Sequence, residues 1–291
     1  MLIKDMKQSS EVGIYTPRPY VKRQYSLIRY ASKTIYELMD IYLPDTGAGP
    51  FPVVIDIHGG GYFYGSRASV RMEPVLNLIQ NGYVVVTVDY TLSPYGKFPL
   101  QIHELKAAIR YLRAHAEEYY INPSRIGLWG LSAGAHLAVL TAVSAGVDEL
   151  DDLSMGNAEY SSEVQAVVDL YGPVDVRIGD AEEGEDPSMT MYATFLGKPL
   201  QMAPELVYLS NPCNFIGDKV PPIFIQHGDA DTLVSVQNSK MLYETVVRKA
   251  KNASCSLEII PGAEHADPVF RTPENSRKIY AFLDQHLKDL P

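Results

Sequence analysis

A serine between two glycines has the setting in this sequence that most directly suggests chemistry. Residues 130–134 read GLSAG, after an apolar run expected to form a strand (125–130) and at the start of an alanine-rich helix (133–146). A strand that turns sharply into a helix strains the residue at the turn, and flanking glycines remove Cβ atoms that would collide there. The pattern predicts Ser132 as a nucleophile held above the sheet edge. The alternative is a plain helix N-cap, for which serine is also favoured.

A serine hydroxyl is a weak nucleophile until a base takes its proton, so a carboxylate and a histidine should follow in the chain. Asp229 and Asp231 end one predicted strand, and His265 ends the next, which satisfies the order Ser, Asp, His. We choose Asp231 as the acid because Asp229 would more naturally form an Asx-type turn with its own loop.

His265 is the histidine of choice because its loop is flanked by Gly262 and Pro268, which indicates an exposed position. We expect structural roles for the others: His103 and His115 at a helix surface, His286 in the last helix, His136 in packing, and His58 and His227 bracing loops at strand ends.

Short apolar runs alternate with longer amphipathic stretches along the chain. The expected buried strands are 51–57, 83–90, 125–130, 164–172, 221–228 and 255–262. The expected helices are 69–81, 99–119, 133–146, 236–250 and 273–288. This pattern predicts an α/β fold with a mostly parallel sheet and helices on both faces. Residues 12–43 should add antiparallel edge strands, and 1–291 should form a single domain.

The interval from Pro173 to Asp218 is long for a connection, which predicts a small cap or lid insertion at about 173–218. Acidic residues crowd this interval and the stretch 146–163. If they form the rim of a site they disfavour anionic substrates, although such a run can also be only a solvated face. They are Asp148, Glu149, Asp151, Asp152, Asp180, Glu182, Glu183, Glu185 and Asp186.

The composition excludes several classes of protein. A net charge of −10 and a pI of about 5.2 argue against a nucleic-acid partner. The first residues carry charges without the apolar stretch of a secretion signal, and no window resembles a membrane span, so we expect a cytoplasmic protein without membrane contact. Cys213 and Cys255 lack metal-binding spacing, so we expect two buried thiols and neither a disulfide nor a metal site.

Several motifs together show a family resemblance: "HGGGY", "VDYTLSP" followed by "FP", "GLSAGA", "HGDADTLV" and "GAEHAD". From about residue 33 to the end, the chain resembles the α/β-hydrolase superfamily, in particular hormone-sensitive-lipase-like esterases and the acetyl-xylan and feruloyl esterase group. The resemblance implies the α/β-hydrolase fold, with Ser132 as nucleophile, Asp231 as acid and His265 as base.

It also implies an oxyanion hole. Its donors are the backbone N–H groups of Gly60 and Gly61 in the HGGG stretch, together with that of Ala133.

These observations predict a serine carboxylesterase that hydrolyses small neutral short-acyl esters, acetylated sugars among them, and needs no cofactor. Tyr62, Tyr64, Tyr95 and Tyr171 fall near predicted strand ends, so we expect them to line the substrate site, with ordinary packing as the alternative. An amide hydrolase, such as an arylformamidase or a peptidase, is the alternative activity. A catalytically dead ligand-binding protein is a third interpretation. The oligomeric state, including a homo-oligomer, stays open.

Overall fold

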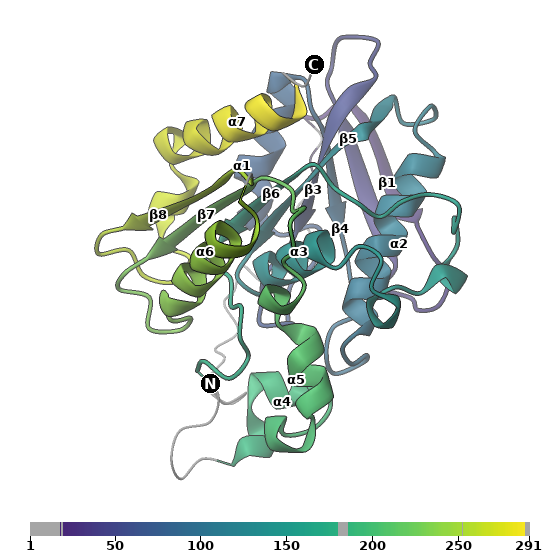
Figure 1. Cartoon of the computed structure of the whole chain (residues 1–291). Helices are drawn as coiled ribbons and strands as arrows, with labels where there is room; N and C mark the ends of the chain where they lie inside the picture. The colour runs from purple at the N-terminus through teal and green to yellow at the C-terminus, as the bar shows by residue number, and fades with distance from the viewer. Residues whose placement is uncertain (1–17, 19, 180–185, 252, 289–291) are drawn as a thin grey trace.

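Runs of valine and isoleucine form the centre of the molecule, because β-branched side chains pack well on a pleated sheet. In this computed structural model, residues 18, 20–179, 186–251 and 253–288 are described. Eight strands form one sheet in the order β1-β2-β4-β3-β5-β6-β7-β8 (Figure 1). The strands are β1 (Arg23–Arg29), β2 (Leu38–Leu43), β3 (Phe51–Ile57), β4 (Val84–Val88), β5 (Ile121–Leu131), β6 (Ala166–Leu170), β7 (Ile223–Gly228) and β8 (Cys255–Ile260).

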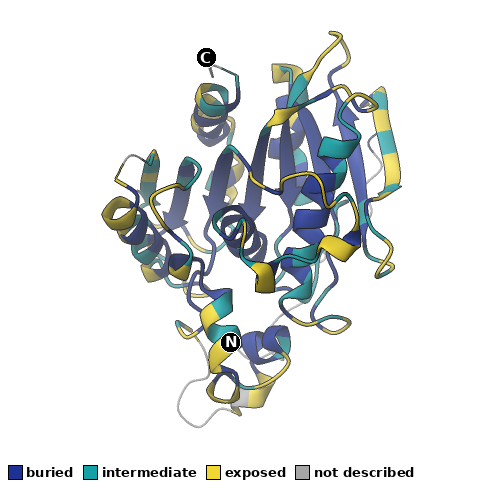
Figure 2. Cartoon of the chain, turned by 45° about the vertical axis from the view of Figure 1, so that its right-hand side comes forward, coloured by how far each residue is buried: buried dark blue, intermediate teal, exposed yellow. Residues whose placement is uncertain are grey.

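The sheet is mostly parallel, as predicted. Strands β3 to β8 run parallel to one another. Strand β2 pairs antiparallel with both β4 and β1, and β1 and β2 thus form the antiparallel edge that the N-terminal pattern predicts. Figure 2 shows the central strands buried, while β1 carries exposed residues. The carboxyl ends of β3 and β5 to β8 therefore meet at one edge, where open α/β sheets bind their ligands.

Helices cover both faces of the sheet, which confirms the predicted layers. Helices α2, α3 and α6 pack on one face, and α1 and α7 pack on the other (Figure 1). The helices are α1 (Glu73–Leu76), α2 (Leu100–Ala114), α3 (Ala133–Val143), α4 (Met191–Leu196), α5 (Pro204–Ser210), α6 (Gln237–Lys249) and α7 (Pro273–Leu287). Among the described residues, no helix has the length and apolar character needed to cross a bilayer.

Residues of β3 alternate between the two faces, as the period of two in a strand requires. Val53, Ile55 and Ile57 join the core beneath α2 and α3, and Val54 joins the core beneath α1 and α7. Asp56 has the same parity as Val54, so it faces the α1 and α7 side.

One helix and one cysteine differ from the sequence prediction. The expected helix 69–81 is divided into the 3-10 helix η2 (Val70–Met72), the short α1 and the 3-10 helix η3 (Asn77–Asn81). Pro74 lies in the first turn of α1 and has no N–H to continue the hydrogen bonding of η2. Cys255 is only partly buried, because it lies at the start of the edge strand β8, whereas Cys213 is buried as predicted.

Helices α4 and α5 lie apart from the two helical layers, below the sheet in Figure 1. They belong to the interval 173–218, for which the sequence predicts a cap. The N-terminal residues that carry the prediction of no secretion signal lie outside the described ranges.

Candidate active site

Ser132 occupies the sharp turn between β5 and α3. Its backbone has φ 53° and ψ −122°, a conformation that is strained for a residue with a side chain. The glycines on either side are required by close packing rather than by their own dihedral angles. A Cβ at Gly130 would lie 2.4 Å from the Cα of Ala135, and one at Gly134 would lie 2.0 Å from the carbonyl oxygen of Ile57.

Three side chains from different strand ends form one hydrogen-bonded chain. His265 Nε2 lies 2.9 Å from Ser132 Oγ, and His265 Nδ1 lies 2.7 Å from Asp231 Oδ2. Because a carboxylate oxygen only accepts, Nδ1 carries the hydrogen and leaves the Nε2 lone pair to face the serine hydroxyl. The arrangement can therefore move the Ser132 proton to His265 while Asp231 holds the ring.

Asp231 is surrounded by hydrogen-bond donors. Its Oδ1 accepts from the N–H groups of Leu233 at 2.9 Å and Val234 at 2.8 Å, and its Oδ2 lies 3.2 Å from His227 Nε2. Burial alone would raise its pKa, but the hydrogen bonds from His227 and His265 and from the Val234 N–H hold that pKa well below its usual value. Asp231 is therefore a fixed anion at neutral pH.

Asp229 does not form the predicted turn with its own loop. Its Oδ1 instead accepts from the N–H of Gly262 at 2.6 Å and so ties the β7 loop to the loop that carries His265. The Asx-type bonds are made by Asp231, because its Oδ1 faces the N–H groups two and three residues on.

The glycine-rich loop after β3 passes directly beside Ser132. Gly60 has φ +111°, and a Cβ there would lie 2.2 Å from the carbonyl oxygen of Tyr64. The N–H groups of Phe63 and Tyr64 donate to the Gly60 carbonyl at 3.0 and 2.9 Å, which fixes the loop as a turn. Within the described residues, the N–H groups of Gly60, Gly61 and Ala133 donate to no protein acceptor. All three residues line the pocket next to Ser132.

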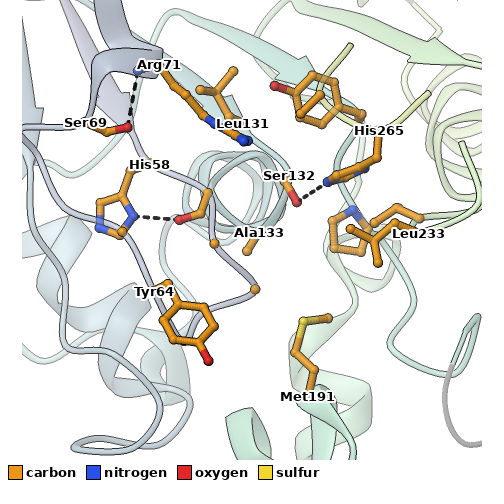
Figure 3. Close-up of a pocket in the computed structure, with 18 of the residues that line it drawn as sticks. His58, Tyr64, Ser69, Arg71, Leu131, Ser132, Ala133, Met191, Leu233 and His265 are labelled. Atoms are coloured by element: carbon orange, nitrogen blue, oxygen red, sulfur yellow. Dashed lines mark hydrogen bonds between the residues drawn. The ribbon is translucent and has the colours of Figure 1, made fainter. Parts of the chain in front are cut away.

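A pocket of about 360 Å³ opens beside Ser132 and His265. Tyr64 and Tyr171, two of the four tyrosines expected at the substrate site, line this pocket. The Tyr171 ring also packs edge-on against the His265 ring, with centroids 5.0 Å apart. Figure 3 shows Arg71 above Ser132 and Met191 below it, with Ser69 and Tyr64 on the left of the view.

Tyr62 and Tyr95 do not line this pocket, which corrects the sequence prediction. Tyr62 is fully buried, stacks on Phe195 of α4 at 4.0 Å and shares a hydrogen bond with His136 Nδ1 at 2.9 Å. Tyr95 is 69% exposed and stacks on Tyr36. Tyr62 contributes its ring to the core against α4, whereas Tyr95 lies on an outer turn.

His136 has the packing role predicted for it. Its Nε2 faces the carbonyl oxygen of Ser210 at 2.6 Å and must donate, so Nδ1 accepts from the Tyr62 hydroxyl. Burial lowers its pKa to about 4, so it stays neutral. The predicted loop-bracing roles of His58 and His227 also match their contacts, with the Gly59 carbonyl and with Ser239 and Val234 respectively.

The acidic stretch 146–163 is not a rim of this pocket. Asp151 pairs with Arg110 of α2, and Asp152 pairs with Lys33 at 2.6 Å, so both face α2 and the β1–β2 connection. Neither Asp148 nor Glu149 lines the pocket. The second acidic run lies in the interval 173–218. Its member Asp186 caps a 3-10 helix by accepting from the Ser188 N–H. The other members of that run, Asp180, Glu182, Glu183 and Glu185, lie outside the described residues.

Sequence reasoning missed several lining residues, of which four bear on the chemistry or shape of the pocket: Asp56, Arg71, Met191 and Leu233. Asp56 carried a usable signal, because it is an acid within the apolar strand "FPVVIDI". The other three carried none, since their approach to Ser132 depends on how η2, α4 and the β7 loop pack. In the described part of the chain, no group of three or more His, Cys, Asp or Glu side chains is placed to hold a metal ion.

Comparison with known sequences finds esterase-related proteins. The BD-FAE family model matches residues 39–246. Among curated proteins, esterase LipC of Mycobacterium tuberculosis is 27% identical over 259 residues, which cover 86% of this chain and 62% of LipC. Esterase LipQ of the same organism is 29% identical over 84% of this chain and 57% of its own length. The chain thus spans about three fifths of the length of these relatives.

Solved structures with the same fold include carbohydrate esterases. A truncated carbohydrate esterase from gut microbiota superposes with a TM-score of 0.83 and 28% identity, over 91% of this chain and 96% of that one. The bifunctional GH43-CE protein of Bacteroides eggerthii superposes with a TM-score of 0.82 and 28% identity, over 90% of this chain and 38% of that one.

Proposed function

This chain belongs to the BD-FAE family and has the α/β-hydrolase fold, and from that premise we propose that it is a serine carboxylesterase for small, neutral, short-acyl esters. The observation that carries the proposal is the hydrogen-bonded chain from Asp231 through His265 to Ser132 at the wall of an open pocket. Relatives and structural neighbours named as esterases support it.

The proposed reaction begins when Ser132 Oγ attacks the ester carbonyl and His265 Nε2 takes its proton. The protonated imidazole is stabilised by Asp231, which stays ionised. His265 then gives the proton to the leaving alcohol, and an acyl-enzyme remains on Ser132. Water attacks this intermediate with His265 again as base, which releases the acid and restores the serine.

The negative oxygen of each tetrahedral intermediate needs donors that are already in place. In the proposal these are the N–H groups of Gly60, Gly61 and Ala133, which lie beside Ser132 and donate to no acceptor in the described protein. Ala133 also begins α3, so the positive end of that helix dipole faces the developing charge.

The size and walls of the pocket favour a small substrate. A volume of about 360 Å³ is near the lower end for ligand pockets, which is about 300 Å³. Met191 of α4 lines it, so in this proposal the interval 173–218 acts as a cap over the bound ester. Two structural neighbours, named as a carbohydrate esterase and as an acetyl ester-xyloside bifunctional hydrolase, favour acetylated sugars among the substrates.

A substrate panel tests the proposal. Turnover would be measured on p-nitrophenyl esters from acetate to decanoate, on N-formylkynurenine and on a dipeptide anilide, with Ser132→Ala as the matched control. We expect acetate and butyrate esters to react fastest. We also expect a fluorophosphonate to add one phosphonyl group to Ser132 and none to the variant, as seen by mass spectrometry.

Faster turnover of N-formylkynurenine or the anilide would assign an amide hydrolase instead. Faster turnover of long-chain esters would remove the short-acyl claim. No adduct and no turnover in folded protein would favour a ligand-binding protein.

A further inference from the structure

Asp56 is a carboxylate within an apolar strand, and it lines the pocket. It lies one residue before the end of β3 and is 2% exposed. Its Oδ1 is buried without a hydrogen-bond partner among the described residues. Leaving a buried carboxylate oxygen unpaired is unfavourable, so a carboxylate kept in this position indicates a partner that the described residues do not supply.

The neighbours of Asp56 in the sheet also have buried polar atoms without a hydrogen-bond partner. The register places Asp56 between Thr87 of β4 and Trp129 of β5. Thr87 Oγ1 and Trp129 Nε1 are also buried without a partner in the described part of the chain. A second cavity of about 10 Å³ touches Trp129 and Arg71, with room for about one water molecule. Buried polar atoms of Thr87 and Trp129 thus lie on the strands beside Asp56.

Among the polar residues that line the pocket, we call Asp56, Ser69, Arg71 and Tyr171 the polar arm. Figure 3 shows Ser69 and Arg71 on the side of Ser132 opposite to Met191. Burial raises the pKa of Tyr171 to about 12, while the charge of Arg71 opposes this rise and that of Asp56 adds to it. Both charges therefore act on the same phenol.

The chemistry of the polar arm selects among substituents that could enter it. An aliphatic chain would leave Asp56 unpaired and desolvated. A carboxylate would be attracted by Arg71 but repelled by the ionised form of Asp56. A neutral hydroxyl can donate to the Asp56 carboxylate and accept from the Arg71 guanidinium at once, because it has both a hydrogen and lone pairs.

We propose that the polar arm is a subsite for a neutral hydroxylated group of the ester, with Asp56 as the hydroxyl acceptor and Arg71 as the donor. This inference rests on the proposed esterase function and narrows it to esters that carry free hydroxyls. The hydroxyl belongs either to the alcohol or to the acyl group of the ester. Two pairs of matched substrates tell these cases apart, because only the pair that differs in the bound group should show a preference.

Two pairs of esters differ by hydroxyls alone. Glycerol 1-acetate and propyl acetate differ in the alcohol, and ethyl lactate and ethyl propionate differ in the acyl group. We expect kcat/KM to favour the hydroxylated member of one pair by roughly tenfold or more, since a site built to bind a hydroxyl rejects an analogue that lacks it. The pair that responds identifies the group that enters the polar arm.

Variants connect this preference to Asp56. Valine suits a strand interior, and Asp56→Val should reduce the preference for the hydroxylated ester to within about twofold. Asp56→Asn should retain part of this preference, because the amide oxygen still accepts a hydrogen bond. Asp169→Asn is the matched control, since Asp169 is a buried carboxylate of β6 that also has an unpaired oxygen but does not line the pocket. It should keep the wild-type preference.

The inference fails if the wild type shows no preference in either pair, or if Asp56→Val and Asp169→Asn keep the preference equally. It also fails if monoethyl succinate is preferred to ethyl butyrate, because the arm would then bind an anion. Failure of the esterase proposal is distinct, since then no ester is hydrolysed. In that case, tighter binding of glycerol 1-acetate than of propyl acetate to Ser132→Ala, measured by calorimetry, supports the subsite, and equal binding overturns it.

Discussion

Two buried aspartates of the same pocket region have opposite surroundings. Asp231, in the loop after β7, accepts from two backbone N–H groups and faces two histidines. Asp56, at the end of β3, has an oxygen without a partner in the described protein, and burial raises its pKa to about 7, against the opposing charge of Arg18. One carboxylate is held as an anion by its neighbours, and the other is not.

The difference shows how a fold can give one residue type two roles. A carboxylate whose acceptor sites are filled cannot rotate or protonate easily, which suits a group that must orient a histidine. A carboxylate with an unfilled acceptor site is unfavourable for folding but available to a ligand. Three predictions test this contrast.

The largest effect is expected from Asp231→Asn. The amide would favour the wrong tautomer of His265, so kcat should fall by about 10³- to 10⁴-fold. Asp229→Asn is the matched control, because Asp229 lies in the same loop and its carboxylate accepts from the Gly262 N–H rather than from His265. It should retain activity within about tenfold. Initial rates on p-nitrophenyl acetate check both, and the reverse order of losses would assign the acid to Asp229.

A smaller effect concerns stability and Asp56. Its pKa is raised from 3.8 to about 7, so the folded state keeps the proton at pH values where the unfolded state has lost it. Stability should therefore decrease as pH rises through this window. Asp56→Asn removes that contribution, so its free energy of unfolding relative to wild type should increase by about 2 kcal/mol from pH 5 to pH 8.

Urea unfolding at both pH values measures the change. Asp169 is a useful reference because burial raises its pKa only to about 6, so Asp169→Asn should show a smaller increase. A pH-independent difference for Asp56→Asn would show that Asp56 is ionised in the folded protein throughout.

The smallest effect is expected at His227, which positions Asp231 without touching the substrate. Its Nε2 faces the Val234 carbonyl at 2.9 Å as well as Asp231, so it donates, and Nδ1 accepts from Ser239 at 2.7 Å. His227→Leu should lower kcat by roughly tenfold with little change in KM, as expected for loss of one hydrogen bond to a charged group.

His227→Gln keeps a donor and should recover part of that kcat at equal substrate affinity. A change in KM alone, or equal kcat values for the leucine and glutamine variants, would mean that His227 serves only the packing of the loop.

The strands and the order of the reactive residues were predictable because they depend on local patterns. Continuous apolar runs identified the parallel strands, and GLSAG identified the turn at Ser132 with its φ of 53°. Two tyrosines of one loop show which features a local pattern does not predict. Tyr62 and Tyr64 are two residues apart in the same loop, yet one is buried against Phe195 and the other lines the pocket.

The sequence by itself therefore determined the layered α/β architecture, the family and the candidates Ser132, Asp231 and His265, since motifs and periodicity are properties of short segments. Only the tertiary structure decided what surrounds the candidate serine. The position of Met191 depends on the packing of α4, and that of Arg71 depends on η2. Oδ1 of Asp56 is unpaired because no donor of the described residues lies within hydrogen-bond reach of it. Such features depend on contacts between segments far apart in the chain, which no local pattern encodes.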